Sequence, residues 1–123
     1  MTLRAEKHNC TENILDIPAN KQDFSACMSI NRELIRLAKG GAKNIIINLE
    51  SAAYIDNTFV NMLLNSEEFC CKAGCTLSIC GMSPDILCAF YLLKLDKRIE
   101  LYETATDALY RKNRLVKRRF RVV

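Results

Sequence analysis

The chain has 123 residues, of which 50% are hydrophobic and 26% are charged. This length and balance fit one globular domain and exclude a collagen-like or disordered chain. No apolar run approaches the roughly 20 residues of a membrane-spanning helix, and the first ten residues contain no apolar stretch typical of a secretion signal. We therefore expect a cytoplasmic protein.

The net charge of +4 is unevenly distributed. Residues 111–123 hold seven basic and no acidic side chains, whereas the remainder, with 11 basic and 14 acidic residues, carries −3. We expect a domain over residues 1–110 and a basic C-terminal helix extension or tail over residues 111–123. Such a block is usually a solvated segment, and peripheral contact with an acidic membrane is the sharper alternative. The basic residues do not alternate with a series of aromatic stacking platforms, so no nucleic acid is expected as partner.

The first half of the chain predicts strands around one helix. Residues 12–17 form a short apolar run that fits a strand, and residues 3–7 are a second extended candidate. Residues 23–39 carry apolar side chains at helical spacing and end at a pair of glycines. Residues 44–49 contain three consecutive isoleucines, a run typical of a central strand covered on both faces.

The second half contains three recognisable helix starts. The Asp56 carboxylate can accept N–H groups of a first turn, so we expect it to cap a helix. Ser83 and Pro84 match the N-cap and first position of another helix, and Thr104 with an acid three residues later resembles a capping pair. The remaining expectations are strands over residues 75–80 and 99–102, and helix ends near residues 72 and 94.

Alternation of strands and helices implies crossover connections and therefore a largely parallel sheet. We predict an α/β fold: a single small domain with a four- or five-stranded, mostly parallel sheet and about four helices.

Seven cysteines are many for this length. All but Cys10 lie among apolar residues, where a reduced thiol packs as a small hydrophobe. There is no C-x-x-C motif and His8 is the one histidine, so neither a metal site nor a cofactor is expected. Cys70 and Cys71 would point in different directions on a helix, and redox sensing by the cysteine cluster stays open as a third hypothesis.

Motifs for catalysis are missing from the sequence. No glycine-rich phosphate loop is present, and one histidine near a terminus does not suit a Ser–His or Cys–His nucleophile. The adjacent Glu67 and Glu68 would point apart on a helix. We therefore expect no enzyme.

An ordered set of short motifs resembles the STAS domain family (sulfate transporter and anti-sigma factor antagonist). The motifs lie at residues 44–50, 55–60, 63–64, 73–77, 81–84, 95–96 and 106–109, so the resemblance spans about residues 12–110. It implies a small α/β domain with a binding role. In the bacterial antagonists of this family, an anti-sigma kinase phosphorylates the hydroxyl residue just after the aspartate, and the unphosphorylated form binds that kinase.

The sequence departs from this family pattern at the phosphoacceptor position. Asn57 follows Asp56 and has no hydroxyl to phosphorylate. Thr58 is the nearby substitute, but one residue rotates a helix by about 100°, which turns Thr58 in another direction. The resemblance implies a partner-binding surface of Asp56, Asn57, Thr58, Phe59 and Val60. Phe59 is expected either to add an apolar contact there or to pack in the core.

The lead hypothesis is a non-catalytic protein–protein interaction module of the anti-sigma factor antagonist type, acting in bacterial transcription regulation. Its partner would be an anti-sigma factor or serine kinase-like protein, or another STAS domain, and a homodimer stays open. The alternative, motivated by the basic residues 111–123, is a cytosolic accessory subunit of a membrane lipid or anion transporter.

Overall fold

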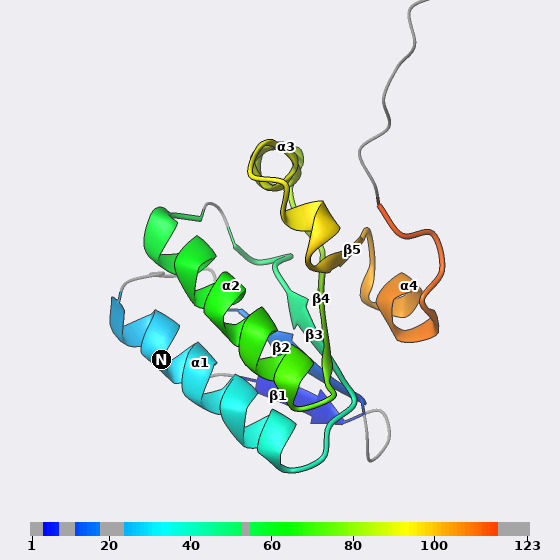
Figure 1. Cartoon of the computed structure of the whole chain (residues 1–123). Coiled ribbons are helices and arrows are strands. Elements are labelled where there is room, and N and C mark those ends of the chain that lie inside the picture. Colours follow the sequence, from blue (N-terminus) through cyan, green and yellow to red (C-terminus); the bar gives the residue numbers. More distant parts are fainter. Residues whose placement is uncertain (1–3, 8–11, 18–23, 53–54, 116–123) are drawn as a thin grey trace, which may run out of the picture.

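The computed structural model describes residues 4–7, 12–17, 24–52 and 55–115, and they form a five-stranded sheet with helices on it (Figure 1). The strands are β1 (Arg4–Lys7), β2 (Glu12–Asp16), β3 (Asn44–Asn48), β4 (Thr76–Cys80) and β5 (Glu100–Tyr102). They lie in the order β1-β2-β3-β4-β5. β2 to β5 are parallel, and β1 pairs antiparallel with β2. The predicted α/β fold with a mostly parallel sheet is confirmed.

The helices cover the two faces of the sheet unequally. α1 (Phe24–Lys39) and α2 (Asn57–Lys72) lie side by side on one face, whereas the short α4 (Ala105–Tyr110) contacts β3, β4 and β5 (Figure 1). α3 (Pro84–Leu92) and the 3-10 turn η1 (Leu95–Lys97) connect β4 to β5. Among the described residues, no helix has the length and apolar character to cross a membrane.

The isoleucine run of β3 is buried on both sides, as predicted. Ile45 and Ile47 belong to the large core under α1 and α2, and Ile46 belongs to a smaller cluster with Tyr102 and Ala108. All three isoleucines are fully buried. Because side chains of a strand alternate between faces, the smaller cluster lies under α4 on the opposite face. The short α4 thus completes the burial of the central strand.

Side-chain caps fix the helix starts that the sequence predicts. The Ser83 hydroxyl accepts the Ile86 N–H at 3.3 Å, and Pro84 occupies the first helical position. The Thr104 hydroxyl likewise accepts the Asp107 N–H at 3.1 Å. Each bond satisfies one of the N–H groups that a helix start leaves without a main-chain partner.

The described part of the basic segment, residues 111–115, is not helical. Arg111 ends α4 with a left-handed φ of 53°. The Leu115 N–H donates to the Leu101 carbonyl at 2.8 Å, and the Leu115 side chain packs against the main core. The Arg114 guanidinium donates to the Asp96 carbonyl at 3.1 Å. Residues 111–115 are therefore attached to the domain, and the expectation for residues 116–123 lies outside the described residues.

Candidate functional site

Asp56 forms the cap from which α2 starts. Its backbone is extended, with φ −119° and ψ 178°, and its side chain accepts the Phe59 N–H at 2.9 Å. A carboxylate at this place also interacts favourably with the positive end of the helix dipole. The predicted cap is confirmed, and it fixes the direction in which the first turn of α2 leaves the sheet.

The first turn of α2 divides into an exposed side and a buried side. Asp56, Asn57 and Thr58 are exposed, whereas Phe59 is 0% and Val60 9% exposed within the main core. In this conformation, therefore, Phe59 and Val60 cannot offer their side chains to a partner. The open question about Phe59 is answered in favour of core packing. We define the three exposed residues, Asp56, Asn57 and Thr58, as the α2 cap surface.

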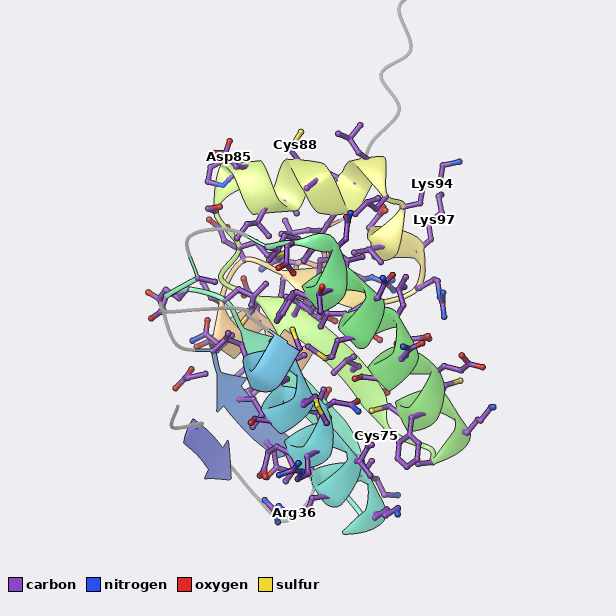
Figure 2. All side chains as sticks on the ribbon, turned by 90° about the vertical axis from the view of Figure 1, so that its left-hand side faces the viewer. Arg36, Cys75, Asp85, Cys88, Lys94 and Lys97 are labelled. Carbon is purple, nitrogen blue, oxygen red and sulfur yellow. The ribbon has the colours of Figure 1, made fainter. Side chains whose placement is uncertain are left out.

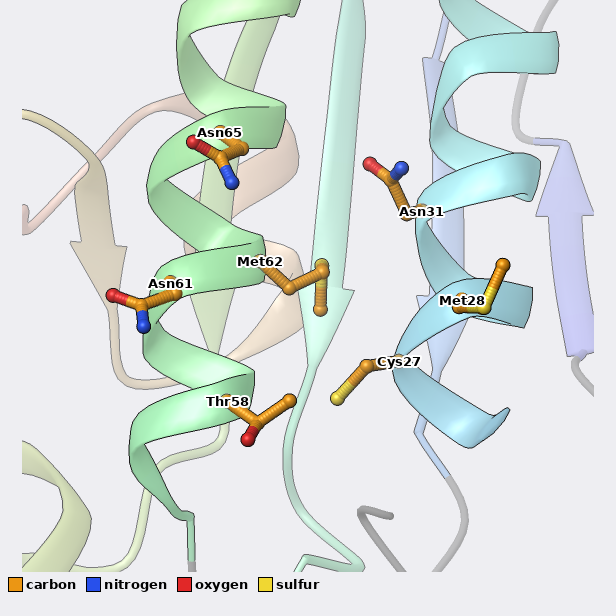
Figure 3. A pocket seen from close by; sticks show the side chains of 7 residues that line it. All are labelled: Cys27, Met28, Asn31, Thr58, Asn61, Met62 and Asn65. Atoms are coloured by element: carbon orange, nitrogen blue, oxygen red, sulfur yellow. The ribbon is translucent and has the colours of Figure 1, made fainter. Parts of the chain in front are cut away.

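Thr58 faces a groove between α1 and α2 (Figure 3). The groove encloses about 380 Å³ and is lined by Cys27, Met28, Asn31, Thr58, Asn61, Met62 and Asn65. Asn57 is not among these residues, so the two neighbours face different surroundings, as the helical rotation predicts. Near the groove, the Ser66 hydroxyl donates to Asn31 Oδ1 at 3.0 Å and ties the two helices together.

A polar cluster at the carboxyl ends of β2, β3 and β4 holds the chain that leads toward α2. Asn48 Nδ2 donates to Asp16 Oδ1 at 2.8 Å, and the Glu50 N–H donates to Asn48 Oδ1 at 3.1 Å. Gly81 packs closely against this cluster. A Cβ atom at this position would lie only 2.5 Å from Asn48 Oδ1, so the close contact requires glycine. This role of Asn48 was not predicted from the sequence, although a polar residue that ends an unbroken apolar strand is a signal for it.

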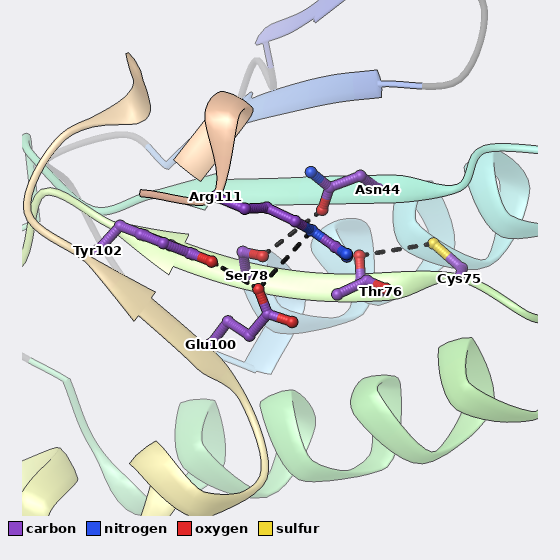
Figure 4. A network of polar contacts seen from close by, with 7 residues as sticks. All are labelled: Asn44, Cys75, Thr76, Ser78, Glu100, Tyr102 and Arg111. Atoms are coloured by element: carbon purple, nitrogen blue, oxygen red, sulfur yellow. Dashed lines mark hydrogen bonds and ion pairs between the residues drawn. The ribbon is translucent and has the colours of Figure 1, made fainter. Parts of the chain in front are cut away.

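A second polar network lies on the opposite face of the sheet, beside α4 (Figure 4). The Tyr102 hydroxyl donates to Glu100 Oε1 at 2.6 Å, and Arg111 Nε lies 3.8 Å from the same oxygen. The Ser78 hydroxyl lies 3.5 Å from Asn44 Oδ1. Burial and, to a smaller extent, the hydrogen bond to Glu100 raise the pKa of Tyr102 to about 12. Tyr102 therefore stays neutral at physiological pH, and Glu100 links β5 to Arg111 at the end of α4.

The cysteines are less uniformly buried than predicted. Cys27, Cys70, Cys75 and Cys80 are buried, and burial raises the pKa of Cys80 to about 12. The expectation for Cys71 and Cys88 is wrong, because both are exposed on the outer sides of their helices (Figure 2 labels Cys88). An amphipathic helix turns some apolar positions outward. The described residues contain no group of three or more His, Cys, Asp or Glu residues that could hold a metal ion.

The adjacent acidic pair on α2 points apart, as predicted. Glu67 forms an ion pair with Arg98 at 2.8 Å, whereas Glu68 lies 3.6 Å from Lys72 on the exposed side. Neighbouring residues on a helix do not face each other, so the two carboxylates cannot act as a pair.

The structure is thus a small α/β domain, and its candidate functional site is the exposed start of the helix α2. The family model of the STAS domain matches residues 9–108 of the sequence. The chain therefore belongs to the STAS domain family.

Solved structures show the same fold at low sequence identity. An anti-sigma factor antagonist from Mycobacterium paratuberculosis has a TM-score of 0.77 and 18% identity, over 89% of this chain and 92% of that one. SpoIIAA, a cell fate determinant of Bacillus solved in its phosphorylated form, has a TM-score of 0.70 and 17% identity, over 89% and 98%.

A domain of a transporter also has this fold. The murine anion transporter Slc26a9 gives a TM-score of 0.69 and 10% identity, over 85% of this chain but 18% of that one. Comparison with curated proteins finds no match.

Proposed function

We propose that this domain is a non-catalytic, cytoplasmic interaction module of the anti-sigma factor antagonist type, which docks a partner through the α2 cap surface. The observation that carries the proposal is the exposure of Asp56, Asn57 and Thr58 at a rigidly capped helix start in a STAS fold. The partner would be an anti-sigma factor or serine kinase-like protein, or another STAS domain. The mycobacterial neighbour, itself an anti-sigma factor antagonist, supports the first class.

The geometry of the α2 cap surface suits docking. The Asp56 carboxylate is held by its bond to the Phe59 N–H, and Phe59 anchors the same turn in the core. A partner therefore meets side chains on a backbone that is already ordered, so binding costs little conformational entropy. Asn57, the first residue of α2, presents a neutral amide that both donates and accepts hydrogen bonds.

A charge substitution tests the docking surface. Asn57→Glu places a carboxylate at the position that the family resemblance gives as the phosphoacceptor. We expect it to weaken binding of an anti-sigma kinase-like partner at least tenfold, or about 1.4 kcal/mol. Thr106→Glu is the matched control, because it adds the same charge in the first turn of α4, also at an exposed position. Titration calorimetry with both variants measures the difference. Equal affinities for Asn57→Glu and the unchanged chain would contradict the proposal.

We further propose that the domain is constitutively unphosphorylated at the α2 cap surface. Asn57 has no hydroxyl, and Thr58 faces the α1–α2 groove instead of the direction of Asn57. Incubation with the partner kinase and ATP should leave the intact mass unchanged. A gain of one phosphoryl group that is absent from Thr58→Ala would assign phosphorylation to Thr58 and contradict this part of the proposal.

A transporter accessory subunit is the second candidate function. The fold of the Slc26a9 domain and the basic residues 111–123 favour it. Each surface Lys or Arg contributes about 1 kcal/mol of attraction to an anionic leaflet. The test is flotation with anionic liposomes of the full chain against a version that ends at Leu115, since Leu115 is packed on the domain. Equal recovery of both versions in the soluble fraction would remove this candidate.

A further inference from the structure

The C-terminal end of α2 brings two cysteines together through its main-chain geometry. The Cys75 N–H donates to the Cys70 carbonyl at 2.7 Å, and the Gly74 N–H donates to the Cys71 carbonyl at 3.2 Å. Gly74 has a left-handed φ of 76°. These are the bonds of a Schellman motif, in which the side chains at the positions of Cys70 and Cys75 contact each other. In most proteins that contact is between two hydrophobes, and here both partners are thiols.

The two thiols are buried, and each one shifts the pKa of the other. Cys70 is 1% and Cys75 5% exposed. Their hydrogen bond raises the pKa of Cys70 and lowers that of Cys75, and burial raises the pKa of Cys70 further. Burial opposes the Cys75 thiolate, and the main-chain N–H of Ile45 favours it. Cys75 is therefore the member of the pair that ionises more readily.

A cavity gives a small molecule access to Cys75. It encloses about 300 Å³, and Cys75, Cys71 and Arg98 are among its lining residues, whereas Cys70 is not. The Cys75 sulfur lies just before β4 (Figure 4). It is 3.8 Å from the Thr76 carbonyl oxygen. An oxidant that enters this cavity reaches Cys75 and the exposed Cys71, whereas Cys70 is not part of the lining.

We propose that Cys70 and Cys75 form a hydroperoxide-reactive thiol pair that is converted to a disulfide. The backbone geometry permits this disulfide. The main-chain hydrogen bond of 2.7 Å from the Cys75 N–H to the Cys70 carbonyl keeps the two Cα atoms within about 7 Å, the range that a disulfide can span. Cys71 is excluded as the partner of Cys70, since adjacent helical residues face different directions and Cys71 is exposed.

The reaction proceeds in two balanced steps. The Cys75 thiolate attacks one oxygen of the hydroperoxide, the O–O bond breaks, and Cys75 becomes a sulfenic acid while the leaving oxygen takes a proton as an alcohol or water. The Cys70 sulfur then attacks the Cys75 sulfur, loses its proton, and displaces water. Overall, two thiols are oxidised by two electrons and one hydroperoxide is reduced.

The disulfide would fix the last turn of α2 to the start of β4. The α2 cap surface lies at the other end of the same helix (Figure 1). The thiol pair is therefore independent of the docking proposal, and its chemistry can be measured without a partner.

Peptide mapping tests the proposal on the full chain. Trypsin cleaves after Lys72, between the two cysteines, and yields peptides 44–72 and 73–94. After treatment with hydrogen peroxide, the seven thiols titrated under denaturing conditions should fall by two, and a non-reduced digest should contain these peptides linked. Because peptide 73–94 also contains Cys80 and Cys88, fragmentation of the linked pair assigns both ends of the bond without any substitution.

Matched variants separate the pair from its neighbour. Cys71→Ser should keep the loss of two thiols, whereas Cys70→Ser and Cys75→Ser should abolish it, with folding of each checked by circular dichroism. A chain that keeps all seven thiols under peroxide that fully oxidises glutathione would overturn the proposal. A bond assigned by fragmentation to Cys71, Cys80 or Cys88 would overturn it as well, whether or not the variants fold.

Discussion

Among the four glycines, Gly81 is the position that tolerates a side chain least. Its φ is +74°, in the left-handed region that favours glycine. A Cβ at Gly81 would lie 2.5 Å from Asn48 Oδ1 and 3.0 Å from the Glu50 nitrogen. The Asn48 carboxamide, or the backbone of Glu50, would have to move to admit a single methyl group. We therefore expect Gly81→Ala to destabilise the domain strongly.

The expected loss has two parts. The left-handed conformation costs alanine about 1–2 kcal/mol. Displacing the Asn48 carboxamide also breaks its bonds to Asp16 and to the Glu50 N–H, each worth about 0.5–1.5 kcal/mol. The free energy of unfolding should thus fall by about 2–5 kcal/mol.

Gly74→Ala is the matched control for backbone strain. Gly74 has nearly the same φ, +76°, but a Cβ there would meet nothing within 4 Å. Urea unfolding of both variants should therefore show a loss of about 1–2 kcal/mol for Gly74→Ala and a clearly larger loss for Gly81→Ala. In the background of Asn48→Ala, the cost of Gly81→Ala should shrink. Equal losses for the two glycines would refute the argument from close packing.

Two further measurements address the core and the opposite face. Phe59→Ala should lower the free energy of unfolding by about 3–5 kcal/mol because Phe59 is fully buried. Thr58 is exposed, so Thr58→Ala should change this free energy by no more than about 0.5 kcal/mol. Similar losses for the two variants would argue against the orientation of this turn. The pKa of Tyr102 is raised from 10.0 to about 12, so the unfolded chain loses this proton first and the urea midpoint should fall as the pH rises from about 10 to 12. Tyr102→Phe should lessen this fall, and an unchanged pH profile would speak against the raised pKa.

Local chemistry made much of the fold predictable. The isoleucines of β3 indicated a strand buried on both faces, and Asp56 and Ser83 indicated helix starts, because each of these signals acts through neighbouring residues alone. The pairing of β1 with β2 could not be predicted with the same means, since antiparallel addition at a sheet edge depends on contacts distant in sequence.

The candidate site was less predictable than the fold. The sequence left two roles open for Phe59, contact with a partner or packing in the core. The direction of α2 over the sheet decides which side of its first turn is buried, and that direction depends on contacts distant in sequence. The contact between Cys70 and Cys75 was also missed. Gly74 carried the signal, since a glycine one residue past a helix end predicts a Schellman motif, and that motif pairs the residues around it.

The amide of Asn57 has a consequence for how such a domain could be controlled. A side chain without an oxygen nucleophile gives a phosphate-transferring enzyme nothing to modify at the first position of α2. Occupancy of the α2 cap surface would then follow mass action, set by how much of each protein a cell contains and by their dissociation constant. Synthesis and degradation would take the place of a covalent mark.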